Sequence, residues 1–396
     1  MIARVRLVRV RSNAAIALVA AASLTGCSVG DGDERPPQLG TKSGDEDAAA
    51  KLGFPSTATK NTIRVGGGDA AADAAGVASA VFPGTGDASR PTAVVLVDKD
   101  DWQAGVTAAA LTARPIGAPI LVSDGGDLSP VTSDTLERLK PKGSDLSKDA
   151  QVIRVGDKPA RPDGFKTAVI QGRNPYERAA AVDRFFSAAK GKPSANVVVT
   201  TGEKAEFAMP AAAWAARSGD SVLLTRKDAV PPATRKALRE HEKPKIFLLG
   251  PPSVISKKVE KDLGKLGDVT RIQGSGPVEN AIAFARFEKG NFGWGVVVPG
   301  FNFTVAGTSR PLDAAASAAL ATKGVFAPLL LTDRADSLPR ALETYLLSVQ
   351  PGFEDDPGQA VYNRVWILGD DKQVSVAAQA RLDQITELIP VQANAP

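Results

Sequence analysis

The sequence predicts an α/β fold made of three tandem repeats of about 100 residues, each built around a parallel sheet. Two observations predict it. Short apolar strands alternate with alanine-rich helices from residue 62 to residue 390, and this alternation calls for right-handed crossovers and parallel strands. A glycine turn from strand to helix also recurs at Gly67, Gly172 and Gly274, which are spaced 105 and 102 residues apart.

Residues 1–26 have the features of a signal peptide. Four arginines form a charged start, and Ala14–Leu24 is an apolar run too short to span a bilayer. The run leads into Leu24-Thr25-Gly26-Cys27, which resembles the lipobox of bacterial lipoproteins. Cys27 is the only cysteine, so an internal disulfide is excluded and acylation accounts for its position. The protein is therefore predicted to be extracytoplasmic and lipid-anchored to the cell membrane at Cys27.

Residues 27–61 are rich in Gly, Pro, Asp, Lys and Ser and contain few large apolar side chains. A segment of this composition buries too little apolar surface to offset its loss of conformational entropy. We therefore expect the lipidated cysteine to be followed by a flexible tether that leads to the repeats.

The charge of the chain excludes one class of partner. There are 48 Lys and Arg against 44 Asp and Glu, and the four arginines of the signal peptide account for the difference. Binding to nucleic acid needs a basic face that displaces phosphate counterions. The balanced composition after residue 26 thus argues against a nucleic acid partner.

The three repeats contain the same elements in the same order, with apolar runs typical of strands buried on both faces. Repeat 1, residues 62–164, has the turn Ile63–Asp69, the strand Val94–Val97, the helix Gln103–Arg114, and the strands Pro119–Ser123 and Val152–Gly156. Repeat 2, residues 165–268, has the turn Val169–Arg178, the strand Val197–Val199, the helix Ala205–Arg217, and the strands Ser221–Thr225 and Phe247–Gly250. Repeat 3, residues 269–390, has the turn Arg271–Asn280, the strand Val296–Val298, the helix Ser309–Lys323, and the strands Pro328–Thr332 and Trp366–Gly369. Repeat 1 is shortened, because it lacks the closing helix that follows the last strand of the other two.

The glycine turns share their physical chemistry. Glycine permits the tight passage from strand to helix, and Asp69 and Asn174 can cap the free N–H groups of the helices that follow. Pro175 and Pro277 suit the first helical position, where no backbone hydrogen bond is lost.

These features resemble the cell wall-binding repeat 2 family. Its Asp-Arg-Tyr-x-Thr-Ala stretch is similar to Asn174–Ala179, and its Gly-Ala-Pro-Ile-Leu strand is present as Gly117–Leu121. Its closing Ile-Leu-Gly-Gly and Val-Ser elements resemble Ile367–Asp370 and Val374-Ser375, and its Asn-Phe-Ala-Asp-Ala-Leu helix start corresponds to Phe207–Pro210 and Asn302–Ala306. The resemblance implies that the three units form a single-chain pseudo-trimer and bind anionic cell-wall polymer without a covalent bond.

Ligands of open α/β sheets bind at the carboxyl ends of the strands, and arginines with other hydrogen-bonding side chains suit an anionic polymer. The polar residues expected at these strand ends are the candidate polymer-binding residues. They are Asp98, Asp101, Arg173, Tyr176, Glu177, Asn302 and Arg310.

Cofactor, metal and nucleophilic sites are weakly supported. Gly66-x-Gly68-x-x-Ala71 resembles half of a dinucleotide fingerprint, but Asp98 lies about thirty residues on where the fingerprint needs its acid at about 20. His241 is the only histidine and is expected on the surface, so histidine clusters for zinc are excluded. Asp355-Asp356 is expected to lie in a solvated loop rather than to form a calcium site. We predict no cofactor, no metal and no catalytic residues.

The leading hypothesis is a non-enzymatic envelope lipoprotein that links membrane and wall by binding a cell-wall polymer. Two alternatives stay open. A solute-binding lipoprotein of an importer would need two lobes around a ligand cleft. An exported enzyme that acts on glycan would need a close pair of carboxylic acids in one pocket, with the pKa of one of them raised.

Overall fold

The computed structural model describes residues 55–65, 67–322 and 325–391, all of which belong to one unit, residues 41–396. The signal peptide, Cys27 and most of the expected tether lie outside the described residues. None of the helices within the described ranges is long and apolar enough to cross a membrane.

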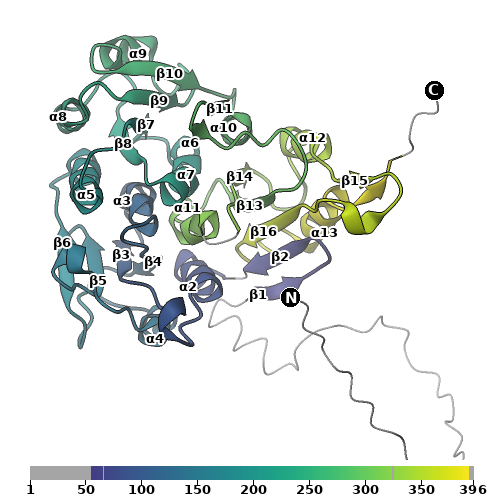
Figure 1. Ribbon diagram of the computed structural model, residues 1–396, viewed down its shortest axis with the longest axis horizontal. Helices are drawn as coiled ribbons and strands as arrows, with labels where there is room; N and C mark the ends of the chain where they lie inside the picture. Colours follow the sequence, from purple (N-terminus) through teal and green to yellow (C-terminus); the bar gives the residue numbers. More distant parts are fainter. Residues whose placement is uncertain (1–54, 66, 323–324, 392–396) are drawn as a thin grey trace, which may run out of the picture. The chain divides into compact units, whose positions relative to one another are not determined.

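Three parallel sheets with the same strand order form the framework, as the repeats predicted (Figure 1). The first unit has the order β4-β3-β5-β6, with β3 at Val94–Asp98, β4 at Ile120–Ser123, β5 at Val152–Val155 and β6 at Thr167–Ile170. The second unit has the order β8-β7-β9-β10, with β7 at Asn196–Thr201, β8 at Ser221–Thr225, β9 at Lys245–Leu249 and β10 at Asp268–Ile272. The third unit has the order β14-β13-β16-β2-β1, with β13 at Asn302–Gly307, β14 at Leu329–Thr332, β16 at Arg364–Leu368, β2 at Thr62–Val65 and β1 at Pro55–Ala58.

Each sheet takes its fourth strand from the start of the next repeat in sequence. Thus β6, which opens repeat 2, pairs with β5 of the first unit, and β10, which opens repeat 3, pairs with β9 of the second. The third unit has no repeat after it, and β2 from the beginning of repeat 1 takes the place, with Thr62 opposite Val365 and Val65 opposite Leu368. The three units are therefore joined into a closed ring by exchanged strands.

The end of the expected tether is ordered, which corrects the expectation for residues 55–61. Strand β1 pairs with β2 in antiparallel register and covers what would otherwise be an open sheet edge. Asn61 is buried, its backbone N–H donates to the carboxylate of Asp383 at 2.7 Å, and its amide donates to the Asp383 carbonyl at 3.0 Å.

A linking helix follows each exchanged strand and leads to the next unit. These helices are α2 (Ala70–Val81), α5 (Pro175–Lys190) and α10 (Pro277–Arg286). The expected caps are present, since Asp69 accepts from the N–H of Ala72 at 2.9 Å and Asn174 accepts from that of Glu177 at 3.0 Å. Pro175 and Pro277 open their helices as predicted.

The three turn glycines are required by close packing. A Cβ on Gly67, Gly172 or Gly274 would lie 2.7, 2.4 and 2.2 Å from the backbone nitrogen of Asp73, Arg178 and Asn280, the sixth residue after each glycine. No side chain fits at these distances, so the equivalence of the three glycines rests on the same helix-to-turn contact in every unit.

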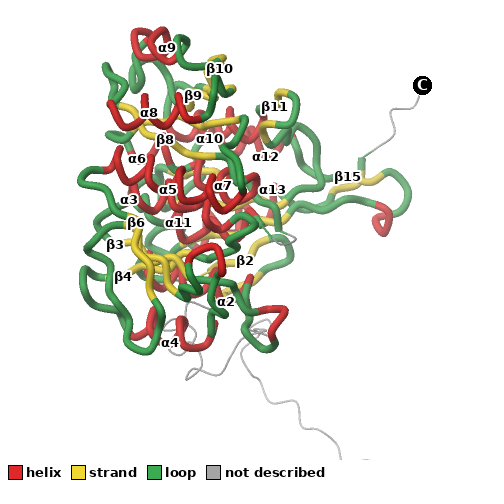
Figure 2. The backbone as a smooth tube through the Cα atoms, turned by 60° about the vertical axis from the view of Figure 1, so that its left-hand side comes forward, coloured by secondary structure: helices red, strands yellow, loops and turns green. Residues whose placement is uncertain are grey.

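The alanine-rich helices lie at the centre between the sheets (Figures 1 and 2). None of the three is one continuous α-helix, because each breaks or tightens midway, into α3 (Trp102–Ala108) with η2 (Ala109–Thr112), α6 (Ala205–Ala208) with α7 (Pro210–Ser218), and α11 (Asp313–Ala316) with η4 (Ser317–Ala321). Helices α3, α7 and α11 contact one another pairwise. A Cβ on Gly105 would lie 2.9 Å from that of Ala315, so small residues allow the helices to approach closely. These contacts bear out the pseudo-trimer.

The remaining helices cover the outer faces of the sheets. They are α4 (Pro130–Leu139), α8 (Pro232–Glu240) and α12 (Arg340–Ser348), followed by the closing helices α9 (Lys257–Leu263) and α13 (Val376–Ile385). The connection from β5 to β6 contains no helix. Short elements complete the described chain, namely η1 (Asp87–Ser89), η3 (Asp145–Ser147), η5 (Pro357–Gln359), β11 (Glu288–Lys289), β12 (Phe292–Gly293), β15 (Gly352–Phe353) and β17 (Ile389–Pro390).

One predicted strand is wrong. Val296–Val298 was expected to be buried in the third sheet, but it forms no strand, and Val297 and Val298 are exposed. The strand at this position is β13, Asn302–Gly307, which was expected to start a helix. Gly295 adopts a positive φ, and Pro299-Gly300 follows the three valines, so the run is enclosed by breakers and too short to pair.

Candidate functional site

Asp98 and Asp101 lie at the carboxyl end of β3, as predicted, but both serve the fold. Asp98 is buried, and its carboxylate accepts from the N–H groups of Asp100 and Gly125, each at 3.0 Å. Asp101 caps α3 by accepting from the N–H of Ala104 at 3.0 Å. Its other oxygen pairs with Arg178 of α5 at 2.6 Å, and both side chains are mostly buried. These contacts leave neither carboxylate free for a ligand.

Arg310 is also engaged within the protein. Its guanidinium pairs with Asp313 at 3.0 Å and with Asp73 of α2, and it donates to the Gly67 carbonyl at 3.2 Å. Burial and the neighbouring carboxylate raise the pKa of Asp73, and burial raises the pKa of Asp313 to about 6 against the opposing effect of Arg310. This is a close acid pair of the kind that a glycan-acting enzyme would need. Both carboxylates are 0% exposed, however, so they cannot reach a glycan.

Asn302 does not lie at the predicted end of its strand. It is the first residue of β13, and therefore sits at the amino edge of the sheet, where its amide donates to the Val325 carbonyl at 2.8 Å. The misplacement follows from the misassigned strand at Val296–Val298. Asn302 is thereby removed from the candidate site.

Two of the three remaining candidates, Tyr176 and Glu177, meet at one groove. Tyr176 and Glu177, in the first turn of α5, line a cavity of about 460 Å³ together with the segment that leads from β8 into α8. Arg226 in that segment holds its guanidinium 5.4 Å from the centre of the Tyr176 ring. The Tyr176 ring also packs on Gly202, where a Cβ would lie 2.9 Å from a ring carbon. We call this cavity the α5–α8 groove, lined by Asn174, Tyr176, Glu177, Arg226, Ala229, Val230, Pro231, Pro232 and Ala233.

The polar groups of the α5–α8 groove are held in defined states. Burial and the charge of Glu203 raise the pKa of Tyr176, which keeps its hydroxyl neutral and able to donate. Hydrogen bonds from the backbone and side chain of Arg173 lower the pKa of Glu177. Arg173 itself is outside the groove, with 90% of its side chain exposed and a 3.2 Å pair to Glu177. Arg226 was not predicted, because an arginine in a polar loop carries no sequence signal of its own.

A second groove occupies the corresponding place in the third unit. It lies between α10 and α12, has a volume of about 680 Å³, and includes Glu279, Arg286, Arg340 and Tyr345. Glu279, like Glu177, is in the first turn of a linking helix. Both grooves therefore contain arginine and tyrosine, together with one acid in the first turn of the linking helix.

Comparison with known proteins identifies one part of the chain. Residues 169–260 match the family model described as cell wall binding domain 2. This segment is a member of that family. It includes the complete α5–α8 groove and all of β7, β8 and β9.

Similarity in fold to solved structures extends over most of the chain. Two solved structures, Cwp8 and Cwp6 from Clostridium difficile, are similar to it with TM-scores of 0.64 and 0.62, each at 18% identity. The similarity covers 83% and 85% of this chain but 52% and 49% of those chains, so this protein spans about half the length of each. No curated protein matches the sequence significantly.

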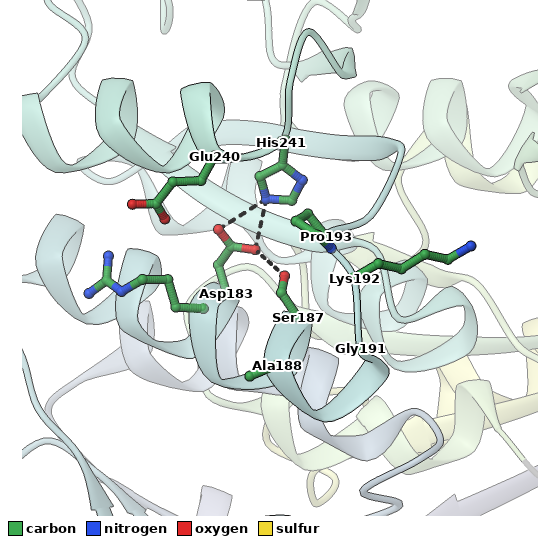
Figure 3. Close-up of a pocket in the computed structure, with 9 residues that line it drawn as sticks. Asp183, Ser187, Ala188, Gly191, Lys192, Pro193, Glu240 and His241 are labelled. Carbon is green, nitrogen blue, oxygen red and sulfur yellow. Dashed lines mark hydrogen bonds and ion pairs between the residues drawn. The ribbon is translucent and has the colours of Figure 1, made fainter.

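The cell wall binding segment also holds a buried ion pair that the sequence did not predict (Figure 3). His241 was expected on the surface, yet its side chain is 1% exposed, and its Nε2 lies 2.9 Å from Asp183. Its Nδ1 lies 2.7 Å from the Ser194 carbonyl. Because both partners are acceptors, both ring nitrogens must donate, and the ring is a charged imidazolium. The hydrogen bonds of His241 to Asp183 and Ser194 satisfy its ring in the buried position, and its charged sequence neighbours gave no sign of them.

This ion pair is not arranged as a nucleophilic triad. The Ser187 hydroxyl lies 3.4 Å from the Asp183 carboxylate, and Ser221 donates to the same oxygen at 2.5 Å. Both nitrogens of His241 are already occupied, so neither serine has a base that could accept its proton. Among the described residues there is also no cluster of acids or histidines that could hold a metal ion.

Proposed function

We propose that this protein is a non-enzymatic envelope lipoprotein that binds an anionic cell-wall polymer and so links the membrane to the wall. The α5–α8 groove is the observation that carries the proposal. It lies wholly within the cell wall binding segment, and within the described residues Arg226 forms no ion pair with an acid.

The groove has the chemistry that an anionic saccharide requires. The planar guanidinium of Arg226 can donate two parallel hydrogen bonds to a phosphate or carboxylate group. Tyr176 offers an aromatic face and a neutral hydroxyl, and Pro231 and Pro232 provide a rigid apolar wall. Glu177 disfavours anions, but its charge is compensated by Arg173 and by the amide of Asn174 at 3.1 Å.

A pull-down with isolated cell walls tests polymer binding. The chain from Ser28 onward contains every described residue and is incubated with walls before and after their secondary polymers are removed. We expect retention on intact walls, loss of retention on stripped walls, and at least about tenfold weaker retention for Arg226→Gln, since a hydrogen-bonded charge is removed. Arg161→Gln is the matched control, because Arg161 is exposed and lies in the first unit outside the groove. Absence of retention on intact walls would overturn the proposal.

Anchoring at Cys27 needs a separate experiment. We propose that acylation of Cys27 holds the protein at the membrane, as the lipobox-like sequence indicates. Cys27→Ser should move the protein from the membrane fraction to the medium, while the full sequence should incorporate labelled fatty acid. If Cys27→Ser remains in the membrane fraction, another segment anchors the chain.

A further inference from the structure

A second cavity lies where the three central helical segments end. It has a volume of about 770 Å³, and the residues at the ends of η2, α7 and η4 line it, including Thr112, Arg217, Ser218 and Thr322. Residues that precede β3 and β4 complete it, so it opens at the amino edge of the first sheet, opposite the edge that bears the α5–α8 groove. We call it the axial pocket. Its volume is in the range of small-molecule sites.

The axial pocket is positively charged. Arg90, Arg114 and Arg217 line it, and no Asp or Glu is among its described lining residues. Arg90 is paired outside the pocket with Asp87 at 2.8 Å. Neither Arg114 nor Arg217 forms an ion pair with any residue that the structure describes. Two arginines therefore remain without compensating charge.

Arg217 is held in place by aromatic rings. Its guanidinium lies 5.4 Å from the Trp294 ring centre and 5.0 Å from that of Phe326. Burial lowers its pKa, with no carboxylate to oppose this effect. Arg217 as a whole is nonetheless an exposed residue, so its guanidinium can reach an anion in the pocket. The aromatic contacts orient the charge but do not neutralise it.

A buried hydroxyl in the pocket also lacks a partner. Thr112 is 3% exposed, and its hydroxyl makes no hydrogen bond within the described part of the chain. Its counterparts at the other two helix ends bond locally, because the Ser218 hydroxyl donates to the Trp214 carbonyl at 2.8 Å and that of Thr322 donates to the Ala319 carbonyl at 2.8 Å. An unpaired buried hydroxyl lowers stability by about 1–3 kcal/mol. Such a group beside two uncompensated arginines indicates a ligand with acceptor oxygens.

We propose that the axial pocket binds a compact multivalent oxyanion of the phosphate type, held by Arg114 and Arg217 and by the hydroxyl of Thr112. The ligand would lie where the helical segments of all three units end and would therefore fasten the units together. Its source is either free phosphate or the phosphate group of a larger molecule. The site is separate from the α5–α8 groove, so it does not depend on the proposed wall binding.

Calorimetric titration with inorganic phosphate, at constant ionic strength set with chloride, tests this proposal. We expect saturable binding that Arg114→Gln and Arg217→Gln each weaken by about tenfold or more. Arg161→Gln is the matched control, because Arg161 is exposed, lines neither the axial pocket nor the α5–α8 groove, and should leave phosphate affinity unchanged. If Arg217→Gln fails to fold, the phosphate affinity of Arg114→Gln alone tests the proposal. No saturable binding, or equal affinity in all three variants, overturns the proposal.

Thr112→Val separates a ligand contact from a structural role. Valine has nearly the same shape and no hydroxyl, so the unliganded variant should be more stable than the original while binding phosphate more weakly. A variant that binds phosphate with unchanged affinity would remove Thr112 from the site and overturn that contact. A parallel titration with a sugar phosphate identifies the source, since tighter binding than that of inorganic phosphate indicates a larger ligand and weaker binding indicates the free ion.

Discussion

Asp73 and Arg178 occupy equivalent positions in two linking helices, six residues after Gly67 and Gly172, yet they carry opposite charges. Each faces an opposite charge from the neighbouring unit, because Asp73 pairs with Arg310 and Arg178 pairs with Asp101. At the third junction Asn280 takes this position, and its amide donates to the Phe207 carbonyl at 3.4 Å. The three junctions of the ring are thus chemically distinct. A linking helix in the wrong junction would place Asp73 against Asp101, which disfavours incorrect assembly.

Reversing one of these charges should destabilise the ring. Arg178→Asp puts a second carboxylate against Asp101 in a mostly buried site, and we expect the free energy of unfolding to fall by about 3–5 kcal/mol. Adding Asp101→Arg restores opposite charges and should recover at least half of the loss. Denaturant unfolding of the two single variants and the double variant measures the coupling. Additive effects would show that the pair does not contribute as an ion pair.

The acid pair on Arg310 should make stability depend on pH. The pKa of Asp313 is about 6 in the folded protein and is lower in the unfolded chain, so folding favours the protonated form. Its stabilising contribution is complete below about pH 4 and is lost as the pH rises through 6. Relative to Asp313→Asn, the original protein should lose on the order of 2 kcal/mol between pH 4 and pH 7. A difference that stays constant over this range would show that the pKa of Asp313 is not raised.

The ionisation of His241 should affect the stability of the fold at a higher pH than that of Asp313. Burial opposes its protonation, but the hydrogen bond and charge of Asp183 and the Ser194 carbonyl outweigh burial and raise its pKa. The imidazolium therefore stabilises the fold below about pH 6.5, and this contribution is lost as the pH rises through the folded pKa. His241 is the only histidine, so its ring resonances can be assigned without ambiguity in NMR spectra. A titration midpoint at or below 6.5 would contradict the raised pKa, and His241→Gln should flatten the fall of Tm above neutral pH.

Much of the architecture could be predicted from local patterns. Runs such as Val94–Val97 and Ser221–Thr225 are apolar throughout, and they form fully buried parallel strands as expected. The glycine turn was predictable because its cause is local, namely the approach of the helix backbone to Gly172. Strand β13 was missed because Phe303–Gly307 mixes apolar and small polar residues, whereas the exposed Val296–Val298 has the stronger pattern.

The site could be predicted only in part, because its contacts depend on which units meet. Tyr176 and Glu177 lie in a groove as expected, but Arg226 approaches them from fifty residues along the chain. Asp101 and Arg310 were chosen as polar residues near strand ends, yet each has an oppositely charged partner from another unit. The composition of a single repeat does not reveal such partners. The strand exchange that brings these units together also has no signature in the sequence.

The turn glycine of the cell wall binding segment offers a direct test of packing. Gly172→Ala places a Cβ 2.4 Å from a backbone nitrogen, which cannot move without displacing the start of α5. We expect a loss of about 2–4 kcal/mol in the free energy of unfolding, in the range of severe overpacking. Gly86→Ala is the matched control, because its backbone is extended and nothing lies within 4 Å of the added Cβ. If Gly172→Ala and Gly86→Ala had the same free energy of unfolding, the turn at Gly172 would be able to open and accept a Cβ.

The exchanged strands also predict where the second unit can be cut. A fragment of residues 165–268 follows the repeat as the sequence divides it, but it carries β6 without its partner β5 and omits nearly all of β10. A fragment of residues 171–273 contains α5 and the complete β8-β7-β9-β10 sheet. Because β9 would otherwise present an open edge, we expect the second fragment to be more soluble and to unfold more cooperatively than the first. Circular dichroism during thermal unfolding and size-exclusion chromatography compare them. If residues 165–268 proved the more stable fragment, β10 would not be needed to complete the unit, and the exchange would serve only to join the ring.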